Sequence, residues 1–397
     1  MENATQNAQQ KIFTKDFIVV STVNLLIMLA YYLLFVVTAS FSVEKFQTSP
    51  SMSGLVAGLM VLGCLLGRFV TGHFITIIGG KKILFTGLLI YTVSMALYLV
   101  IHTLPLFIAI RFISGLGVGF IGTATGTLVA HIVPQAKRGL GISFFSLSTI
   151  AGLAAGPFLG ILLMHLTSYE AIFGFTIFCG IAGILIAVFL GHVNIARGPA
   201  KSFWRLSNYL EYDIIPFAIM TLCISVCWGN LQAFISVLAA QKNLIHAASL
   251  FFLFYALAAF GTRPVMGMLY DKRNENVVVY PALLATVAGM LLLALTGSGT
   301  VLLLAAVILG FGIGNFQSIS QVISLKLVQP ERFGQATSTY FIFLDLGVGF
   351  GPYLFGFLVP WLGYTGLYIA SAVLALVGIP FYMAVHGRKA GDAAGLL

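Results

Sequence analysis

The sequence predicts an all-α integral membrane protein with twelve transmembrane helices, arranged as two six-helix bundles related by a parallel repeat. Three observations predict this fold class. Only 8% of the 397 residues are charged, against about 25% in ordinary soluble domains. The apolar residues gather in runs of about 20, the length that crosses roughly 30 Å of hydrocarbon as a helix. The two halves of the chain also share glycine, arginine and proline at one fixed offset.

The apolar runs give the predicted spans in order. They cover residues 17–39, 53–75, 83–101, 104–128, 140–164, 171–191, 214–237, 247–269, 278–296, 300–325, 336–360 and 366–385. The longest polar and basic interruption lies between the sixth and seventh spans. We therefore divide the chain into an N-terminal bundle (1–191), a cytoplasmic linker (192–213) and a C-terminal bundle (214–397).

The basic residues between the spans predict the orientation. The gaps that face one side hold only Lys45 and Lys242, whereas the opposite gaps and the two tails hold most of the other lysines and arginines. Positive residues mark the cytoplasmic side. We therefore expect a multi-pass protein of the cell membrane with both termini in the cytoplasm. The net charge of +9 then needs no nucleic acid as a partner.

A shift of 195 residues superposes the two halves. Arg68, Gly72, Gly115, Gly117, Gly119, Gly139, Gly152, Gly156 and Pro157 fall on Arg263, Gly267, Gly310, Gly312, Gly314, Gly334, Gly347, Gly351 and Pro352. Six spans is an even number, so the second copy enters the membrane from the same side as the first. Such parallel repeats form transporters with the substrate site between the halves.

Two motifs stand in the middle of spans. Arg111 lies in an uncharged run and precedes a Gly-x-Gly pair, and an arginine inside a membrane usually faces the bundle interior or a water-filled cavity. A structural ion pair is the alternative. In the fifth span, Gly152-x3-Gly156-Pro157 gives a flat helix face and a bend. Simple helix packing would explain this pattern as well.

Two short basic turns form a third motif. The turn after the second span carries Arg68, Gly72 and Lys81, and the turn after the eighth carries Arg263, Gly267 and Asp271. A carboxylate at a helix end can accept hydrogen bonds from a neighbouring helix N-terminus or from an arginine. We expect Asp271 to latch two helices together, with a solvated turn as the alternative.

The chain resembles the major facilitator superfamily, and within it the twelve-span drug/proton antiporters, over residues 15 to 386. Arg111, Gly115 and Gly117 match that group's fourth-span motif, and Gly152 to Gly160 match the fifth-span signature of proton-coupled exporters. The turn after the second span departs from the pattern, because Thr76 stands where an aspartate is expected and Gly80 where an arginine is usual. The resemblance implies alternating access. The expected conformational and gating residues are Arg68, Gly72, Lys81, Gly152, Gly156, Pro157, Arg263, Gly267, Asp271, Gly351 and Pro352.

The resemblance also implies that the first, fourth, seventh and tenth spans line the transport path. Their polar and aromatic residues form the predicted substrate cavity, namely Asn24, Tyr31, Arg111, Trp228, Asn230, Gln232, Asn315, Gln317 and Ser318. This set suits an amphipathic organic molecule. If Arg111 faces the ligand, it favours a carboxylate or another anionic group. These four spans offer no acid for a lipophilic cation.

Asp345 is the acid that the sequence places deep in a span. The charge of a carboxyl group depends on burial and on nearby charges, so Asp345 can bind a proton in one state and release it in another. We predict that Asp345, with Arg111, couples transport to protons. A neutral carboxyl group with a structural hydrogen bond is the alternative.

The sequence therefore predicts a proton-coupled antiporter that exports a small amphipathic solute, such as an anionic or zwitterionic metabolite or a metal chelator. The alternatives are multidrug efflux, uptake by proton symport and a non-transporting scaffold or receptor. The expected partners are a small-molecule substrate, protons and the lipid bilayer, and we expect a monomer. No ATP-binding loop, metal-ligand cluster or nucleophile–base pair occurs in the sequence, so we predict no enzymatic activity, cofactor or metal.

Overall fold

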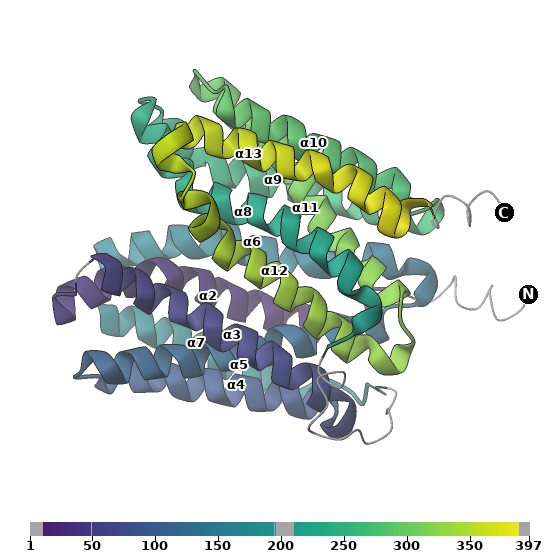
Figure 1. Ribbon diagram of the computed structural model, residues 1–397. Coiled ribbons are helices and arrows are strands. Elements are labelled where there is room, and N and C mark those ends of the chain that lie inside the picture. Colours follow the sequence, from purple (N-terminus) through teal and green to yellow (C-terminus); the bar gives the residue numbers. More distant parts are fainter. Residues whose placement is uncertain (1–10, 49, 194, 196–209, 389–397) are drawn as a thin grey trace, which may run out of the picture. The chain divides into compact units, whose positions relative to one another are not determined.

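The computed structural model describes residues 11–48, 50–193, 195 and 210–388. In this part of the chain, twelve long helices follow one another (Figure 1). They are α2 (Lys15–Phe46), α3 (Pro50–Ile78), α4 (Gly80–Leu97), α5 (Leu104–Ile132), α6 (Arg138–Leu166), α7 (Tyr169–Val188), α8 (Ile215–Gln241), α9 (Ile245–Lys272), α10 (Asn276–Ala294), α11 (Gly299–Lys326), α12 (Phe333–Gly356) and α13 (Val359–Tyr382). A π-helical turn, η6 (Met383–Gly387), follows α13.

Each predicted span corresponds to one helix, so the predicted all-helical fold is confirmed. Of the described helices, 11 are long and apolar enough to cross a membrane. The remaining long helix, α12, begins with a polar stretch from Gln335 to Thr339 that lowers its mean hydropathy. This stretch belongs to a segment with its own contacts, described below.

The boundary between the last two predicted spans was wrong. The span predicted at 336–360 ends as α12 at Gly356, and α13 already begins at Val359. Gly363 interrupts α13 with φ 63° and ψ −177°, a backbone conformation that glycine adopts without steric cost. The regular part of α13 therefore starts close to the predicted position, after a kink that hydropathy does not reveal.

The helices form two compact units. Unit 1 comprises Met1–Pro134, Leu147–Tyr212 and Val328–Phe341, and unit 2 comprises Gln135–Ser146, Asp213–Leu327 and Ile342–Leu397. The first turns of α6 thus pack in unit 2, and the first turns of α12 pack in unit 1. These two exchanged segments cross the predicted division at 1–191, 192–213 and 214–397, which stays a prediction. Of the predicted linker, residues 194 and 196–209 lie outside the described part of the chain.

The repeat seen in the sequence is also a repeat of packing. In unit 1, α5 approaches α3 so closely that a Cβ atom on Gly115 would lie 2.0 Å from the Met60 carbonyl oxygen. In unit 2, α11 approaches α9 in the same way, and a Cβ atom on Gly310 would lie 2.3 Å from the carbonyl oxygen of Tyr255. Small residues at matching positions thus let two helix backbones meet in each unit.

The Gly-x3-Gly faces pack as the sequence predicts. Gly152 and Gly156 of α6 lie against α2, and a Cβ atom on Gly152 would lie 2.8 Å from the backbone nitrogen of Leu29. Gly347 and Gly351 of α12 lie against α8 in the same manner. Pro157 and Pro352 occupy matching positions inside α6 and α12. Their gating role stays a prediction.

Candidate functional site

Asn24 joins three helices of unit 1. Its Nδ2 donates to Ser148 Oγ at 2.7 Å and to Thr149 Oγ1 at 2.9 Å, both on α6. Its Oδ1 lies 3.4 Å from the Thr125 hydroxyl of α5. Asn24 is 2% exposed, so this predicted cavity residue ties α2 to α5 and α6 in the observed geometry. The sequence signal for its partners was weak, because Ser148 and Thr149 only precede the glycine pattern of α6.

Arg111 is fully buried in unit 1. Its Nε donates to the Val56 carbonyl oxygen at 3.1 Å, and its Nη1 lies 3.1 Å from the sulfur of Met60. Both partners belong to α3, so the guanidinium bridges α5 and α3 beside the Gly115 contact. Tyr31, the other aromatic residue predicted to line the path in this unit, is partly buried and packs edge-on against Tyr32.

In unit 2, the predicted residues of α8 contact α9 and α13. Trp228 stacks on Tyr255 of α9, with ring centroids 4.6 Å apart. Asn230 is fully buried and donates through Nδ2 to Ser371 Oγ of α13 at 3.0 Å. Gln232 is only partly buried. These residues are placed at mid-helix, but their described contacts run to neighbouring helices of the same unit.

Of the predicted residues of α11, Ser318 lies near the start of α6 and Asn315 contacts α9. Asn315 donates to Thr262 Oγ1 of α9 at 2.9 Å. Ser318 lies 3.2 Å from Ser143 Oγ and 3.4 Å from Ser146 Oγ, which belong to the exchanged segment of α6. Gln317 is partly buried. The hydroxyl cluster of Ser143, Ser146 and Ser318 was missed from the sequence because Ser318 is 175 and 172 residues from the other two.

Asp345 lies in the middle of α12, in the part of that helix that packs in unit 2. It is half-buried. Among the described residues, the other aspartates and glutamates lie at helix ends or in the connections between helices. Asp345 therefore keeps the position that predicted a coupling role, and the role itself stays a prediction.

Two arginines hold the exchanged segments. Arg263 donates to the Gly314 carbonyl oxygen at 2.8 Å and to the Ser146 carbonyl oxygen at 3.1 Å. The Arg68 guanidinium lies over the Phe341 ring at 4.3 Å, and the Ser338 hydroxyl donates to the Arg68 carbonyl oxygen. Arg68 and Arg263 are related by the 195-residue shift, and so are their partners Phe341 and Ser146.

Asp271 makes the contact predicted for it. Its carboxylate accepts hydrogen bonds from the backbone N–H groups of Gly139 at 2.8 Å and Leu140 at 2.9 Å, the second and third residues of α6. These N–H groups have no partner within their own helix, and the positive end of the helix dipole favours the carboxylate. Gly267 brings α9 into contact here, because a Cβ atom on it would lie 2.7 Å from the Gly139 carbonyl oxygen.

The first repeat lacks this carboxylate. Thr76, at the position of Asp271, donates within its own helix to the His73 carbonyl oxygen. Gly72, at the position of Gly267, is buried near Gly334 of α12. Lys81 donates to the Val188 carbonyl oxygen at 3.2 Å and also to that of Leu190. It therefore caps the end of α7, a contact that the sequence did not predict.

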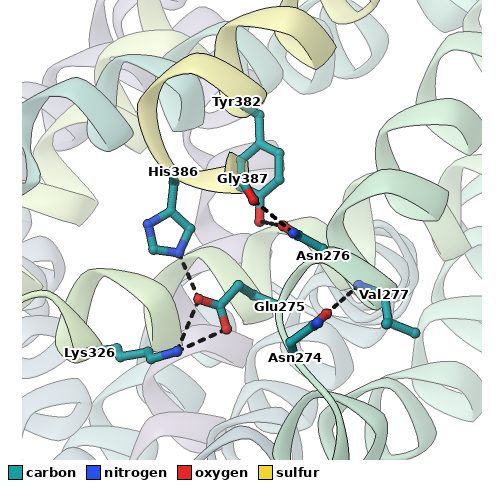
Figure 2. Close-up of polar contacts among 8 residues, drawn as sticks. All are labelled: Asn274, Glu275, Asn276, Val277, Lys326, Tyr382, His386 and Gly387. Carbon is teal, nitrogen blue, oxygen red and sulfur yellow. Dashed lines mark hydrogen bonds and ion pairs between the residues drawn. The ribbon is translucent and has the colours of Figure 1, made fainter. Parts of the chain in front are cut away.

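A buried carboxylate was missed altogether. Glu275, just before α10, accepts from Lys326 Nζ at 3.0 Å and lies 2.8 Å from His386 Nε2 (Figure 2). Burial raises the pKa of Glu275, but the hydrogen bonds from His386 and Lys326 outweigh burial and lower it to about 2. The group is therefore ionised throughout the physiological range. Since a carboxylate only accepts, Nε2 of His386 carries the shared proton.

Comparison with known proteins identifies the fold family. The family model of the Major Facilitator Superfamily matches residues 20–207 and 217–395. The chain belongs to this superfamily. It is therefore a secondary transporter and a multi-pass membrane protein, as the sequence predicted, and the transport path of this superfamily passes small molecules.

Relatives and solved structures of the superfamily agree with this assignment. An MFS-type transporter of Methanocaldococcus jannaschii, MJ1560, is 24% identical over 348 residues, which cover 84% of this chain and 89% of the relative. The MFS-type transporter YhhS of Shigella flexneri is 24% identical over 339 residues, 83% of this chain and 82% of the relative. Two solved structures share the fold. The human organic anion transporter MFSD10 (TETRAN) has a TM-score of 0.78 at 17% identity, covering 92% of this chain and 98% of that one. The proton:xylose symporter XylE has a TM-score of 0.76 at 15% identity, covering 94% and 95%.

Proposed function

We propose that this transporter is a proton-coupled antiporter of the cell membrane that exports a small amphipathic organic solute by alternating access. The observation that carries the proposal is Asp345, a half-buried acid in the middle of a membrane helix. Such intramembrane acids mark proton relays in transporters. Glu275 does not suit this role, because its pKa of about 2 keeps it ionised at every physiological pH.

The substrate we propose is anionic or zwitterionic, for example a carboxylate metabolite or a metal chelator. Arg111 supports this choice, because the predicted path contains this cation and no acid within the predicted spans 17–39, 104–128, 214–237 and 300–325. In the observed geometry α3 encloses the guanidinium, so contact with a solute requires α3 to separate from α5 there. Arg111 is thus proposed both to bind the solute and to respond to it.

The same proposal includes the residues that change contacts during the transport cycle. Asp271, Arg68 and Arg263 hold the exchanged segments of α6 and α12 in one state and release them in another. Both termini are cytoplasmic by the distribution of lysine and arginine. The transporter works as a monomer, with the lipid bilayer and protons as its other partners.

Two transport alternatives differ from this proposal in direction and in solute. Uptake by proton symport uses the same fold, because XylE is a proton:xylose symporter of similar architecture. Multidrug efflux would replace the anion with lipophilic compounds. A scaffold or receptor without transport predicts that no solute crosses at all.

Proteoliposomes with an imposed pH gradient distinguish these functions. Candidate solutes come from metabolites that accumulate in the medium of cells producing the protein, supplemented with a panel of organic acids, zwitterions and lipophilic cations. Antiport predicts solute accumulation inside vesicles whose interior is acidic. Accumulation only with an alkaline interior indicates symport, and no flux with any solute contradicts both.

The coupling role of Asp345 has a matched control on the same helix. Asp345→Asn removes the acid in the middle of α12, and Glu331→Gln removes an exposed acid just before α12 begins. We expect Asp345→Asn to abolish gradient-driven accumulation while equilibrative exchange of solute persists, and Glu331→Gln to behave like the wild type. Gradient-driven transport by Asp345→Asn at the wild-type rate would remove Asp345 from the mechanism.

A further inference from the structure

The turn between α9 and α10 carries two acids with different partners. Asp271 caps the first turn of α6, and Glu275 is buried among the ends of α11 and α13. Only Lys272, Arg273 and Asn274 separate them. So short a connection transmits the position of one acid to the other.

Unit 2 holds Glu275 from two sides. The ammonium group of Lys326, at the end of α11, contacts both carboxylate oxygens at 3.0 Å. His386, in η6, contacts one of them at 2.8 Å (Figure 2). Glu275 is 3% exposed, and hydrogen bonds that involve a charge are about twice as strong as neutral ones. Displacing the turn would leave a buried carboxylate without its partners.

The residues beside Glu275 strengthen this attachment. Asn276 donates to the Gly387 carbonyl oxygen at 2.8 Å and accepts from the Tyr382 hydroxyl at 2.8 Å (Figure 2). Asn274 Oδ1 accepts from the backbone N–H of Val277 at 3.2 Å, which caps α10. Close packing is required as well, because a Cβ atom on Gly387 would lie 2.6 Å from the Tyr280 hydroxyl.

The internal repeat links the two acids. The 195-residue shift places Thr76 opposite Asp271 and Gly80 opposite Glu275. The repeat that has the capping acid therefore has the buried acid too, and the other repeat has neither.

We infer that Glu275 is a positioning residue for Asp271: it fixes the α9–α10 turn to the ends of α11 and α13, so that the Asp271 carboxylate stays against the first turn of α6. The inference deepens the latch role that the proposed function gives to Asp271. It does not depend on which solute is carried or on proton coupling.

Hydrogen exchange of the first turn of α6 tests the inference without a substrate. Peptides covering residues 138–143 are followed by mass spectrometry in the full-length protein in nanodiscs. Asp271→Ala is the reference for loss of the cap. Glu44→Gln is the matched control, because Glu44 is also a hydrogen-bonded acid, paired with the Tyr169 hydroxyl in unit 1. We expect Glu275→Gln to raise the exchange rate of this peptide about tenfold, close to Asp271→Ala, and Glu44→Gln to leave it unchanged.

A different pattern of hydrogen exchange would overturn the inference. If Glu275→Gln raises exchange only at residues 383–388 and leaves residues 138–143 as in the wild type, Glu275 anchors the end of α13 and does not position Asp271. Should Glu275→Gln fail to fold, Lys326→Met is judged by the same two peptides. A failed transport assay with intact exchange effects would overturn the proposed function and leave this inference standing.

Discussion

The two exchanged segments are held by different chemistry, although the repeat places them at equivalent positions. In unit 2, the first turn of α6 is capped by Asp271, and Arg263 donates to the Ser146 carbonyl oxygen further along the same exchanged segment. In unit 1, Thr76 stands at the position of Asp271 and donates within its own helix, and an ion pair holds the start of α12 instead of a cap. Arg332 lies 2.6 Å from Glu211, whose backbone N–H also donates to the Thr339 hydroxyl at 2.9 Å.

This difference shows how a duplicated fold becomes asymmetric. The tie in unit 2 is made by residues of the repeated turn itself. The tie in unit 1 depends on Glu211, at the end of the predicted linker, so it links α12 to the segment that leads into α8. We call the contacts that hold the start of α6 in unit 2 and the start of α12 in unit 1 the two junctions. We expect them to respond differently to acid, to a bulkier side chain and to loss of a charge.

The largest expected effect concerns acid stability in unit 2. The depressed pKa of Glu275 means that its ties stabilise the fold fully above about pH 4.5 and are lost as pH falls toward 2. The stability difference between the wild type and Glu275→Gln should be about 3 kcal/mol near pH 7 and vanish near pH 2. Unfolding in mixed micelles across this pH range measures it. The charged and polar groups that face Glu275 are Lys326, His386, Tyr270 and Tyr382, and a parallel His386→Gln series shows how much of the difference depends on the contact with the histidine. A pH-independent difference would contradict the assignment.

Added bulk should distinguish the two junctions next. A Cβ atom on Gly139 would lie 2.6 Å from the Tyr270 ring, 2.7 Å from the Asp271 carboxylate and 2.9 Å from the Gly267 carbonyl oxygen. The matching atom on Gly334 would lie 2.2 Å from Ile75 Cγ2 but 3.7 Å from the nearest backbone atom, the Gly72 carbonyl oxygen, so relief requires a shift of one side chain and not of a helix backbone. We expect Gly139→Ala to cost about 2 kcal/mol and Gly334→Ala less than half of that in the free energy of unfolding. Equal costs would show that α9 lies no closer to α6 than α3 does to α12.

Removal of the ion pair between Arg332 and Glu211 should lower the free energy of unfolding through its effect on unit 1. Arg332→Gln removes the ion pair that Arg332 makes with the fully buried Glu211 carboxylate, and the partial exposure of Arg332 moderates the cost to about 1 to 2 kcal/mol. Lys272→Gln, which removes an exposed cation at the end of α9, is the matched control. Unfolding titrations compare the two variants. A cost for Arg332→Gln no greater than that of the control would mean that the ion pair does not hold α12.

Loss of the cap should have the smallest effect on stability. Asp271→Ala removes two hydrogen bonds from the first turn of α6, and loss of an N-terminal cap costs about 1 kcal/mol. Thr76→Ala, at the equivalent position, should cost less than half as much, since Thr76 only bonds within its own helix. The same unfolding titration measures the cost of both substitutions. A larger cost for Thr76→Ala would reverse the comparison.

The sequence predicted much of the fold but less of the site. Hydropathy located one helix for each span, and the 195-residue shift predicted that Gly115 and Gly310 serve the same packing. Asp271 was found because it lies four residues beyond Gly267, at the end of a predicted span. The contacts of Asn24 and Asn230 were not predictable, because hydroxyl groups on several neighbouring helices are available as partners for each amide.

The role of Glu275 was not predicted from the sequence, for a different reason. Its partners Lys326 and His386 are 51 and 111 residues away, and each looks like an ordinary polar residue at a helix end. The repeat offered one signal, because Glu275 has only Gly80 opposite it. The kink at Gly363 likewise depends on a backbone angle that hydropathy does not record.

Moving the carboxylate from one repeat to the other tests the account most directly. The double variant Thr76→Asp with Asp271→Thr exchanges the two residues, and hydrogen exchange is read at residues 138–143 of α6 and 333–338 of α12. We predict that protection of the α6 peptide falls to the level of Asp271→Ala while protection of the α12 peptide rises. Unchanged protection at both helix starts would contradict the claim that this single carboxylate makes the two junctions different.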